Sequence, residues 1–462
     1  MSEERSPMAG IRCGTKVNVM STQQTQDCTW HEVGPARLPV PDAWESARTG
    51  LGAVFVHPED AGTFRPSLVL KVLPRSEGTS MAWLSTVALA ADRELLHEPR
   101  FISDDVWETA TGLGRMHLVL YRSDLEQIAS QRWLVPAGAS TVEATATYAV
   151  SDSDRMEPLM RSMVSEMQVD EHQPSAGTVA ELPGREPKVD DDAMEAWGQP
   201  LERLRKLQWA NRWPFQGPVL PRASFDFLAT TATREGPLGR LEAGAFGREV
   251  EQLAGLGLMD GRARWTPLGH RVADGFRNRR FYAQTTLRFG ERLSQFDLFA
   301  GQNMATALTG PSYHDLLEGA VPDPETRPHE LMGLSTCIGA VAQWVGLAPA
   351  WTLGAPVVVD AEPLYGTLRS GGPTGTDGMP CPRGFERFWG RPWVEWTVGI
   401  PELERGLRFI NAGEAGHFAI EDIDDYSRVR LAPAPSFSVW QELRRLFEAA
   451  VDRLPAEEGA PS

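Results

Sequence analysis

The chain has 462 residues, of which 42% are hydrophobic and 15 are tryptophans. A folded domain takes roughly 100–200 residues, so this length and composition predict two or three domains with real cores and exclude a disordered chain. The formal net charge of −17 disfavours a protein whose main task is to grip a phosphate backbone, since such proteins carry a clustered basic surface.

Residues 1–29 form a polar tail that mixes charged and uncharged polar side chains. It has no apolar stretch of the kind that makes a secretory signal, and none that would make Cys13 a lipoprotein cysteine. The other cysteines, Cys28, Cys337 and Cys381, are scattered and form no C-x-x-C pair, which suits a reducing compartment. No run of about 18 apolar residues predicts a membrane-spanning helix. We therefore expect a cytoplasmic protein.

The segment 30–168 reads as a compact α+β domain. Apolar residues at helical spacing predict helices over Met81–Leu96 and Asp154–Met167. Runs rich in β-branched and apolar residues predict strands: Arg37–Val40, Ala53–His57, Ser67–Leu73, Phe101–Asp105, Val106–Thr111, Met116–Arg122, Gln127–Val135 and Thr141–Ala149. This order predicts an antiparallel sheet with helices packed against it.

Three features of this segment resemble the LpqN family of actinobacteria. They are the phrase ARLPVPDAWE at 36–45, the F-x-P-S-x-V-L run at Phe64–Leu70, and Tyr148 followed by a helix. That family is similar in fold to PsbP-type α/β/α sandwiches. The resemblance implies a PsbP-like antiparallel sheet with packed helices for residues 30–168.

Residues 169–193 are acidic and rich in Pro and Gly, which predicts a linker. A second domain is expected over 194–451, followed by a polar tail at 452–462. Its predicted helices are Ala193–Trp209, Gly247–Leu256, Gly269–Phe276, Ser312–Ala320, Glu330–Val345 and Ser436–Val451. Its predicted strands are Ala283–Arg288, Leu293–Gly301, Met304–Leu308, Arg408–Asn411, Phe418–Asp422 and Arg428–Ala432.

The second domain shows an internal repeat. When 296–320 is laid over 418–446, strand, turn, strand, proline and helix coincide. We interpret this as a duplicated β-β-β-α unit. A loop rich in Gly and Pro (Ser370–Gly384) lies between the two copies.

This second domain resembles the EspG family, cytosolic specificity chaperones of ESX (type VII) secretion. The matching features are the helix end LAGLGLMDGRA at 253–263, the paired strand meanders, and the closing phrase from Gly416 to Phe447. The resemblance implies an EspG-like, pseudo-duplicated domain that binds PE/PPE-like secretion substrates as a chaperone or adaptor, without cofactor or turnover. The LpqN-like domain would then be an additional docking module.

Residues 225–276 allow a different interpretation, because the order helix, short ribbon, helix also occurs in winged-helix DNA-binding proteins. A positive cluster lies here: Arg262, Arg264, Arg271, Arg277, Arg279 and Arg280. Such arginines could contact phosphates, although the surrounding chain is strongly acidic. A transcriptional regulator therefore remains the alternative function.

No motif predicts catalysis, a cofactor or a metal. The nine histidines show no H-E-x-x-H or H-x-H spacing, and there is no G-x-S-x-G sequence. The glycine-rich run Gly372–Gly378 lacks the G-K-[ST] of a phosphate-binding loop. The acidic group at Glu421–Asp425 lacks EF-hand spacing and favours a hairpin turn. We therefore predict a protein that is not an enzyme.

Two apolar features have both a structural and a functional interpretation. The first is an aromatic cluster made by Phe385, Phe388, Trp389, Trp393 and Trp396. Such a cluster packs a core or forms a partner-binding patch, because aromatic side chains bury large areas at low entropy cost. The apolar helix predicted at 330–345 either crosses the core or covers a helical client. The sequence names no interface residue.

Overall fold

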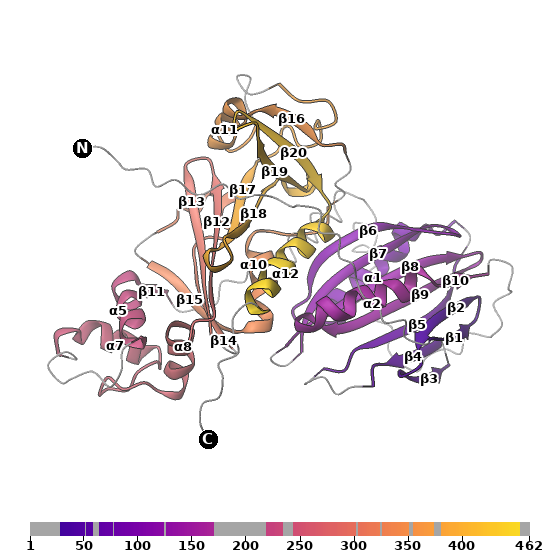
Figure 1. Ribbon diagram of the computed structural model, residues 1–462, viewed down its shortest axis with the longest axis horizontal. Coiled ribbons are helices and arrows are strands. Elements are labelled where there is room, and N and C mark those ends of the chain that lie inside the picture. Colours follow the sequence, from indigo (N-terminus) through magenta and orange to yellow (C-terminus); the bar gives the residue numbers. More distant parts are fainter. Residues whose placement is uncertain are drawn as a thin grey trace.

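The computed structural model describes residues 28–50, 52–58, 64–76, 78–123, 126–170, 219–233, 244–301, 304–323, 326–350, 354–373 and 380–452. The predicted helix Ala193–Trp209, most of the predicted linker, and nearly all of both polar tails lie outside these residues. Within them, helices and antiparallel sheets form an α+β fold, as predicted (Figure 1). We call residues 28–170 the N-terminal unit and residues 219–452 the C-terminal unit.

The N-terminal unit is built on an antiparallel sheet with the strand order β3-β4-β5-β9-β8-β7-β6. Its strands are β3 (Glu45–Thr49), β4 (Gly52–Val56), β5 (Ser67–Pro74), β6 (Arg100–Thr109), β7 (Gly112–Ser123), β8 (Glu126–Ala137) and β9 (Ser140–Ala149). A small second sheet joins β1 (Cys28–Val33), β2 (Ala36–Pro41) and β10 (Gln168–Val169). The helices are α1 (Met81–Leu95), η1 (Val150–Asp152) and α2 (Ser153–Ser165).

The predicted strands and helices of this unit are present, but two predicted strands form one, and the strands β1, β3 and β10 were not predicted. The runs Phe101–Asp105 and Val106–Thr111 were predicted as separate strands but form one strand, β6, whose pairing with β7 shifts register between Phe101 and Ser103. A bulge of this kind breaks the alternation of apolar side chains without ending the strand. The unpredicted strand β3 is exposed along its whole length and so carries no apolar pattern.

The C-terminal unit contains one long sheet with the strand order β11-β15-β14-β13-β12-β17-β18-β19-β20-β16. Its strands are β11 (Val219–Pro221), β12 (Phe281–Phe289), β13 (Arg292–Ala300), β14 (Met304–Thr309), β15 (Thr326–Gly333), β16 (Val357–Asp360), β17 (Val394–Ile400), β18 (Arg405–Asn411), β19 (His417–Ile423) and β20 (Arg428–Ala434). Its helices are α5 (Arg222–Ala232), α7 (Gly247–Gly255), α8 (Pro267–Arg277), α9 (Tyr313–Leu317), η2 (Leu334–Thr336), α10 (Cys337–Trp344), α11 (Ala361–Arg369), η3 (Pro401–Leu403), η4 (Gly413–Ala415) and α12 (Ser436–Asp452).

The strand order of this sheet is symmetric about the neighbouring strands β12 and β17. On each side a four-strand meander runs outward, an earlier strand closes the edge, and a helix follows the last meander strand: α10 after β15, and α12 after β20. The predicted duplication is therefore present in the connectivity. The sequence overlay matched β13-β14-α9 with β19-β20-α12. In the sheet, the counterpart of β19-β20-α12 is β14-β15-α10, so the overlay is displaced by one strand.

The predicted helix Glu330–Val345 is wrong over its first part. Residues Glu330–Gly333 complete β15 and pair with β14, and the α-helix α10 covers only Cys337–Trp344. Periodicity does not separate a short buried strand from a buried helix when the whole stretch is apolar. Pairing with β14 decides the structure here.

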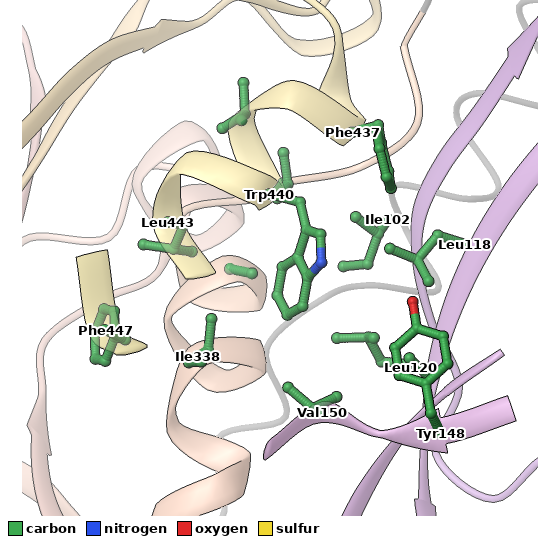
Figure 2. Close-up of a cluster of buried hydrophobic side chains, with 14 of the residues drawn as sticks. Ile102, Leu118, Leu120, Tyr148, Val150, Ile338, Phe437, Trp440, Leu443 and Phe447 are labelled. Carbon is green, nitrogen blue, oxygen red and sulfur yellow. The ribbon is translucent and has the colours of Figure 1, made fainter. Parts of the chain in front are cut away.

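The two units share one apolar core. Figure 1 shows α10 and α12 lying between the long sheet and the N-terminal unit, and Figure 2 shows Trp440 of α12 between Ile338 of α10 and the strands that carry Ile102 and Leu118. All four side chains are buried. Because burial of apolar surface stabilises roughly in proportion to area, we expect the units to be tightly joined.

A buried ion pair lies in the same interface. The Nη2 atom of Arg444 on α12 is 3.0 Å from Oε2 of Glu157 on α2, and Gln441 donates to the other carboxylate oxygen of Glu157 at 2.9 Å. Arg161 of α2 places its guanidinium carbon 5.0 Å from the ring centroids of both Trp107 and Phe437. Polar contacts of this kind fix the relative orientation of the units, which apolar contacts alone leave loose.

His417, at the start of β19, is buried, and neither of its ring nitrogens has a hydrogen-bond partner in the described part of the chain. Burial lowers the pKa of His417 to about 3. The folded state therefore keeps the imidazole neutral, whereas the unfolded chain binds a proton below about pH 6.5. Folding stability must fall as the pH drops from about 6.5 towards 3.

We predict that His417→Phe removes this acid sensitivity. On going from pH 8 to pH 5, the free energy of unfolding of the wild type should fall by roughly 2 kcal/mol more than that of the variant, as the difference in pKa requires. Urea unfolding of both proteins at the two pH values measures this difference. Equal losses in both proteins would contradict the assignment of a neutral, buried His417.

Candidate partner-binding site

The two central strands of the long sheet have one buried and one half-exposed face. On β12 the alternate residues Phe281, Ala283, Thr285 and Leu287 are buried, while the residues between them are partly exposed. On β17 the same alternation places Trp396 in the core and Thr397 on the other face. The buried face packs on α12 and α10, through ring contacts of Phe281 with Phe447 and of Phe296 with Trp344.

The opposite, half-exposed face carries polar side chains, and we call it the central polar face. It is made by Tyr282, Gln284, Thr286 and Arg288 of β12, Gln295 and Asp297 of β13, Arg327 of β15, Glu395, Thr397 and Gly399 of β17, Arg408 of β18 and Asp422 of β19. Its positive and negative side chains balance in number. This face therefore carries no net charge, although the chain as a whole is strongly negative.

Asp297 organises one side of the central polar face. One of its carboxylate oxygens accepts from the Tyr282 hydroxyl and from Gln284 at 3.2 Å, and the other pairs with Arg327. Burial, followed by the bond to Asp297, raises the pKa of Tyr282, so its hydroxyl stays protonated and donates. Arg327 also donates to the carbonyl oxygen of Leu308 at 2.7 Å. These bonds tie β12, β13, β14 and β15 together.

Arg408 organises the other side. Its guanidinium donates to Glu395 at 2.7 Å, to the Tyr365 hydroxyl at 3.0 Å and to Asp422 at 3.3 Å. Glu395 lies in turn 3.9 Å from Arg288 of β12. A charged network therefore crosses from β12 through β17 and β18 to β19 and α11. Each charged side chain in it is held in place by an ion pair or a hydrogen bond to the next.

The centre of the face, where β12 meets β17, is uncharged and has little side-chain bulk. The hydroxyls of Thr286 and Thr397 are 2.7 Å apart. Gln284 lies opposite Gly399, and Gly399 lies opposite Gly406 of β18. A Cβ atom added at Gly399 would meet no atom within 4 Å. Glycines inside strands often mark places where a ligand or another backbone approaches closely.

Two lobes cover the same face of the sheet on either side of this centre. Helices α5, α7 and α8 form the helical lobe, which packs Phe225 and Phe276 on Phe299 of β13. The second lobe contains α11 and packs Phe385 and Phe388 on Phe418 of β19. Figure 1 shows α8 and α11 towards opposite ends of the sheet. The central polar face is the part of this surface between them.

The two apolar features singled out in the sequence are core elements. Phe385, Phe388, Trp393 and Trp396 are all 0% exposed, and the partly buried Trp389 packs on Trp393. The interpretation of the aromatic cluster as a partner-binding patch is therefore wrong. Helix α10 is also buried along its whole length, between the long sheet and the N-terminal unit. It crosses the core and offers no surface to a client.

The helix–ribbon–helix order expected within 225–276 is present as α7, a bridge pairing Met259 with Trp265, and α8. Its arginines do not form one free basic face: Arg264 pairs with Asp260, Arg277 donates to the carbonyl oxygen of Ala232, and Arg279 lies 3.7 Å from Glu402. Arg262 and Arg271 are exposed. Helix α7, which precedes the ribbon, carries the acidic residues Glu249 and Glu251. DNA binding by this lobe stays a prediction.

A cluster of serine, histidine and aspartate lies under α1 in the N-terminal unit. The Ser85 hydroxyl is 3.5 Å from Nδ1 of His117, whose Nε2 is 3.5 Å from Asp92. All three are almost completely buried, and Ser85 donates to Asp104 at 2.8 Å. A buried hydroxyl that is already bonded to a carboxylate is not presented to a substrate, so we assign the cluster to anchoring α1. No group of His, Cys, Asp and Glu in the described residues could hold a metal ion.

The sequence interpretation missed the central polar face altogether. The available signal was the strict alternation of apolar and other residues in VEWTVGI, at 394–400, which is typical of a half-exposed strand. The sequence pattern instead groups Trp396 of this strand with the aromatic cluster. Pairing of β12 with β17, which creates the site, joins residues more than a hundred positions apart.

Within the described residues, no helix is both long enough and apolar enough to cross a membrane. No protein-family model matches the chain, and no curated protein matches it. The EspG resemblance of the C-terminal unit therefore remains a prediction.

Several solved structures are similar to about a third of the chain. Cyanobacterial PsbP of Synechocystis sp. PCC 6803 has 9% identity and a TM-score of 0.26, and covers 34% of this chain and 98% of its own. LpqN of Mycobacterium tuberculosis, described as involved in cell envelope biogenesis, has 12% identity and a TM-score of 0.24, over 31% and 91%. The Ran-binding protein Mog1p of Saccharomyces cerevisiae has 14% identity and a TM-score of 0.25, over 31% and 96%.

Proposed function

We propose that the protein is a non-catalytic, cytoplasmic chaperone or adaptor associated with ESX (type VII) secretion, which binds PE/PPE-like substrates. The central polar face is its binding site in this proposal. One observation carries the site: the middle of the long sheet is left half-exposed between two lobes that cover the same face on either side. The family resemblance of residues 220–450 supplies the class of partner.

The chemistry of the face suits stoichiometric binding and not turnover. Its charged groups already neutralise one another, as Arg408 does with Glu395 and Asp422, so none is poised to attack a substrate. A partner would gain contact area over Thr286, Thr397 and the glycine pair at Gly399 and Gly406, where its backbone can come close. Specificity would come from hydrogen bonds between the partner and the polar side chains around this centre, because unpaired polar groups in an interface are costly.

The N-terminal unit lies on the other side of α10 and α12, away from the central polar face (Figure 1). It therefore leaves that face free for a client. We propose that the unit is an additional docking module of the same complex, directed to another secretion component.

Introducing an arginine at the centre of the central polar face should abolish client binding. Thr397→Arg breaks the bond to Thr286 and places a bulky charge where the partner would lie, so we expect client recovery to fall at least about tenfold, as for a binding hot spot. The assay is affinity capture of the tagged chain from nuclease-treated lysate of its native host, followed by mass spectrometry. Ser46→Arg, on the exposed strand β3, is the matched control and should retain the client.

The transcriptional-regulator alternative makes a different prediction in the same experiment. Without nuclease, a regulator would recover specific DNA fragments, and Arg262→Glu or Arg271→Glu in the helical lobe would abolish that recovery. Capture of DNA and no secretion-type client would exclude the chaperone proposal. A client that binds equally well to Thr397→Arg would exclude the central polar face as its site.

A further inference from the structure

Helix α12 contacts both the N-terminal unit and the inner face of the strands that carry the central polar face. Towards the N-terminal unit, its Trp440 and Phe437 lie beside Ile102 and Leu118 (Figure 2). Towards the long sheet, Phe447 contacts Phe281 of β12 with ring centroids 5.9 Å apart. α12 also packs on β18 and η3. The helix is therefore the layer that joins the two.

Neighbouring residues of one strand link the inner layer to the central polar face. Phe281 points to α12, and the next residue, Tyr282, lies on the central polar face, where it bonds to Asp297. The backbone N–H of Tyr282 donates to Glu402 of η3 at 3.2 Å. On β17, buried Trp396 precedes Thr397 in the same way. Displacement of α12 would thus move residues of the binding face, because a close-packed core transmits strain from one layer to the next.

The N-terminal unit holds α12 and α10 through contacts that cannot shift cheaply. Glu157 and Arg444 form an ion pair whose side chains are 5% and 4% exposed. On α10, Gly339 lies so close to the buried Gln127 of β8 that an added Cβ would be 2.2 Å from Oε1. Contacts of this kind favour one docked arrangement, since separating the ion pair leaves buried charges unpaired and sliding α10 along β8 brings other side chains against Gln127.

We propose that the N-terminal unit is a brace for the central polar face: its docking on α10 and α12 holds β12, β17 and β18 in their binding-competent arrangement. The N-terminal unit, proposed above as a docking module, would then also determine how rigid the client site is on the opposite face of the sheet. The consequence for client binding rests on the proposed function, but the bracing itself does not.

Hydrogen–deuterium exchange of the purified full chain, without a partner, tests the brace. Two variants loosen the interface: Glu157→Gln neutralises the buried acid and keeps a bond to Gln441, and Gly339→Ala crowds Gln127. We expect exchange to rise in α12 and, at least about threefold, in β12, β17 and β18. Loosening the interface would lower the free energy of local opening of the helix and of the strands packed on it together. Restoring space with Gln127→Ala in the Gly339→Ala background should reverse the effect.

The matched control is Asp104→Asn, which removes a buried charge from the opposite side of the N-terminal sheet. Asp104 accepts from Ser85 of α1 and from Arg115 at 3.1 Å. Exchange should rise only in α1, β6 and β7 of this variant. Unchanged exchange of β12, β17 and β18 in both interface variants overturns the brace. Failure of the proposed function would be seen separately, as wild-type protein that captures no client while the strands still respond.

Discussion

Replacing Arg444 with methionine is expected to lower the free energy of unfolding by about 3–5 kcal/mol, because it leaves the carboxylate of Glu157 buried without its cation. Glu157 is buried and accepts from Arg444 at 3.0 Å. Its other cation, Arg161, is more distant at 3.8 Å and is partly exposed. Urea unfolding at pH 7 measures the loss.

The double variant Glu157→Gln/Arg444→Met separates loss of the ion pair from loss of packing. The glutamine carries no charge and can still bond to Gln441, so at least half of the lost stability should return. Replacing a whole buried ion pair by neutral groups is often tolerated, whereas removing one partner is not. A double variant as unstable as the sum of the two single variants would show that the charge itself is unimportant here.

Trp440→Ala is expected to destabilise the protein by about 3–5 kcal/mol, the range for removing a large buried aromatic side chain. Trp440 is 3% exposed and lies between the two units (Figure 2). Because the cavity would open in the shared core, we also expect the single unfolding transition to split, with the two units melting separately. Calorimetry and denaturant unfolding followed by two probes measure this.

Trp83→Ala is the control for Trp440→Ala. Trp83 lies on α1 and is 38% exposed, so its removal should cost less than about 1 kcal/mol and leave the transition single. If Trp440→Ala cost no more than Trp83→Ala, the interface would contribute little to stability. The units would then be independent domains on a common chain.

Much of the fold could be predicted from the sequence where local patterns are strong. The helices α1, α2, α7, α8 and α12 follow apolar residues at helical spacing, and most strands follow β-branched runs. The errors occur where long-range pairing decides. The end of β15 at Glu330–Gly333 is apolar like the helix that follows, and only its partner strand makes it extended. The predicted break in β6 between Asp105 and Val106 is wrong for the same reason, because pairing with β7 continues through both residues.

The candidate site was much harder to predict than the fold. Its members come from six strands, and apart from Gly399 each is an ordinary polar residue with no motif around it. Thr286 and Thr397 acquire meaning only when β12 pairs with β17. The aromatic residues that stood out in the sequence, such as Trp393 and Phe385, are core residues, as large apolar side chains usually are. The interface between the units left no trace in the sequence, because Glu157 and Arg444 look like ordinary charged residues on amphipathic helices.

The most direct test of the proposed binding site is photo-crosslinking in the native host, with a benzophenone amino acid in place of Thr286. Thr286 lies half-buried at the centre of the central polar face. We predict a covalent adduct with a PE/PPE-like secretion substrate, and none when the same probe replaces Ser46 on β3. An adduct from Ser46 but not from Thr286, or no protein adduct at all from Thr286, would contradict the account.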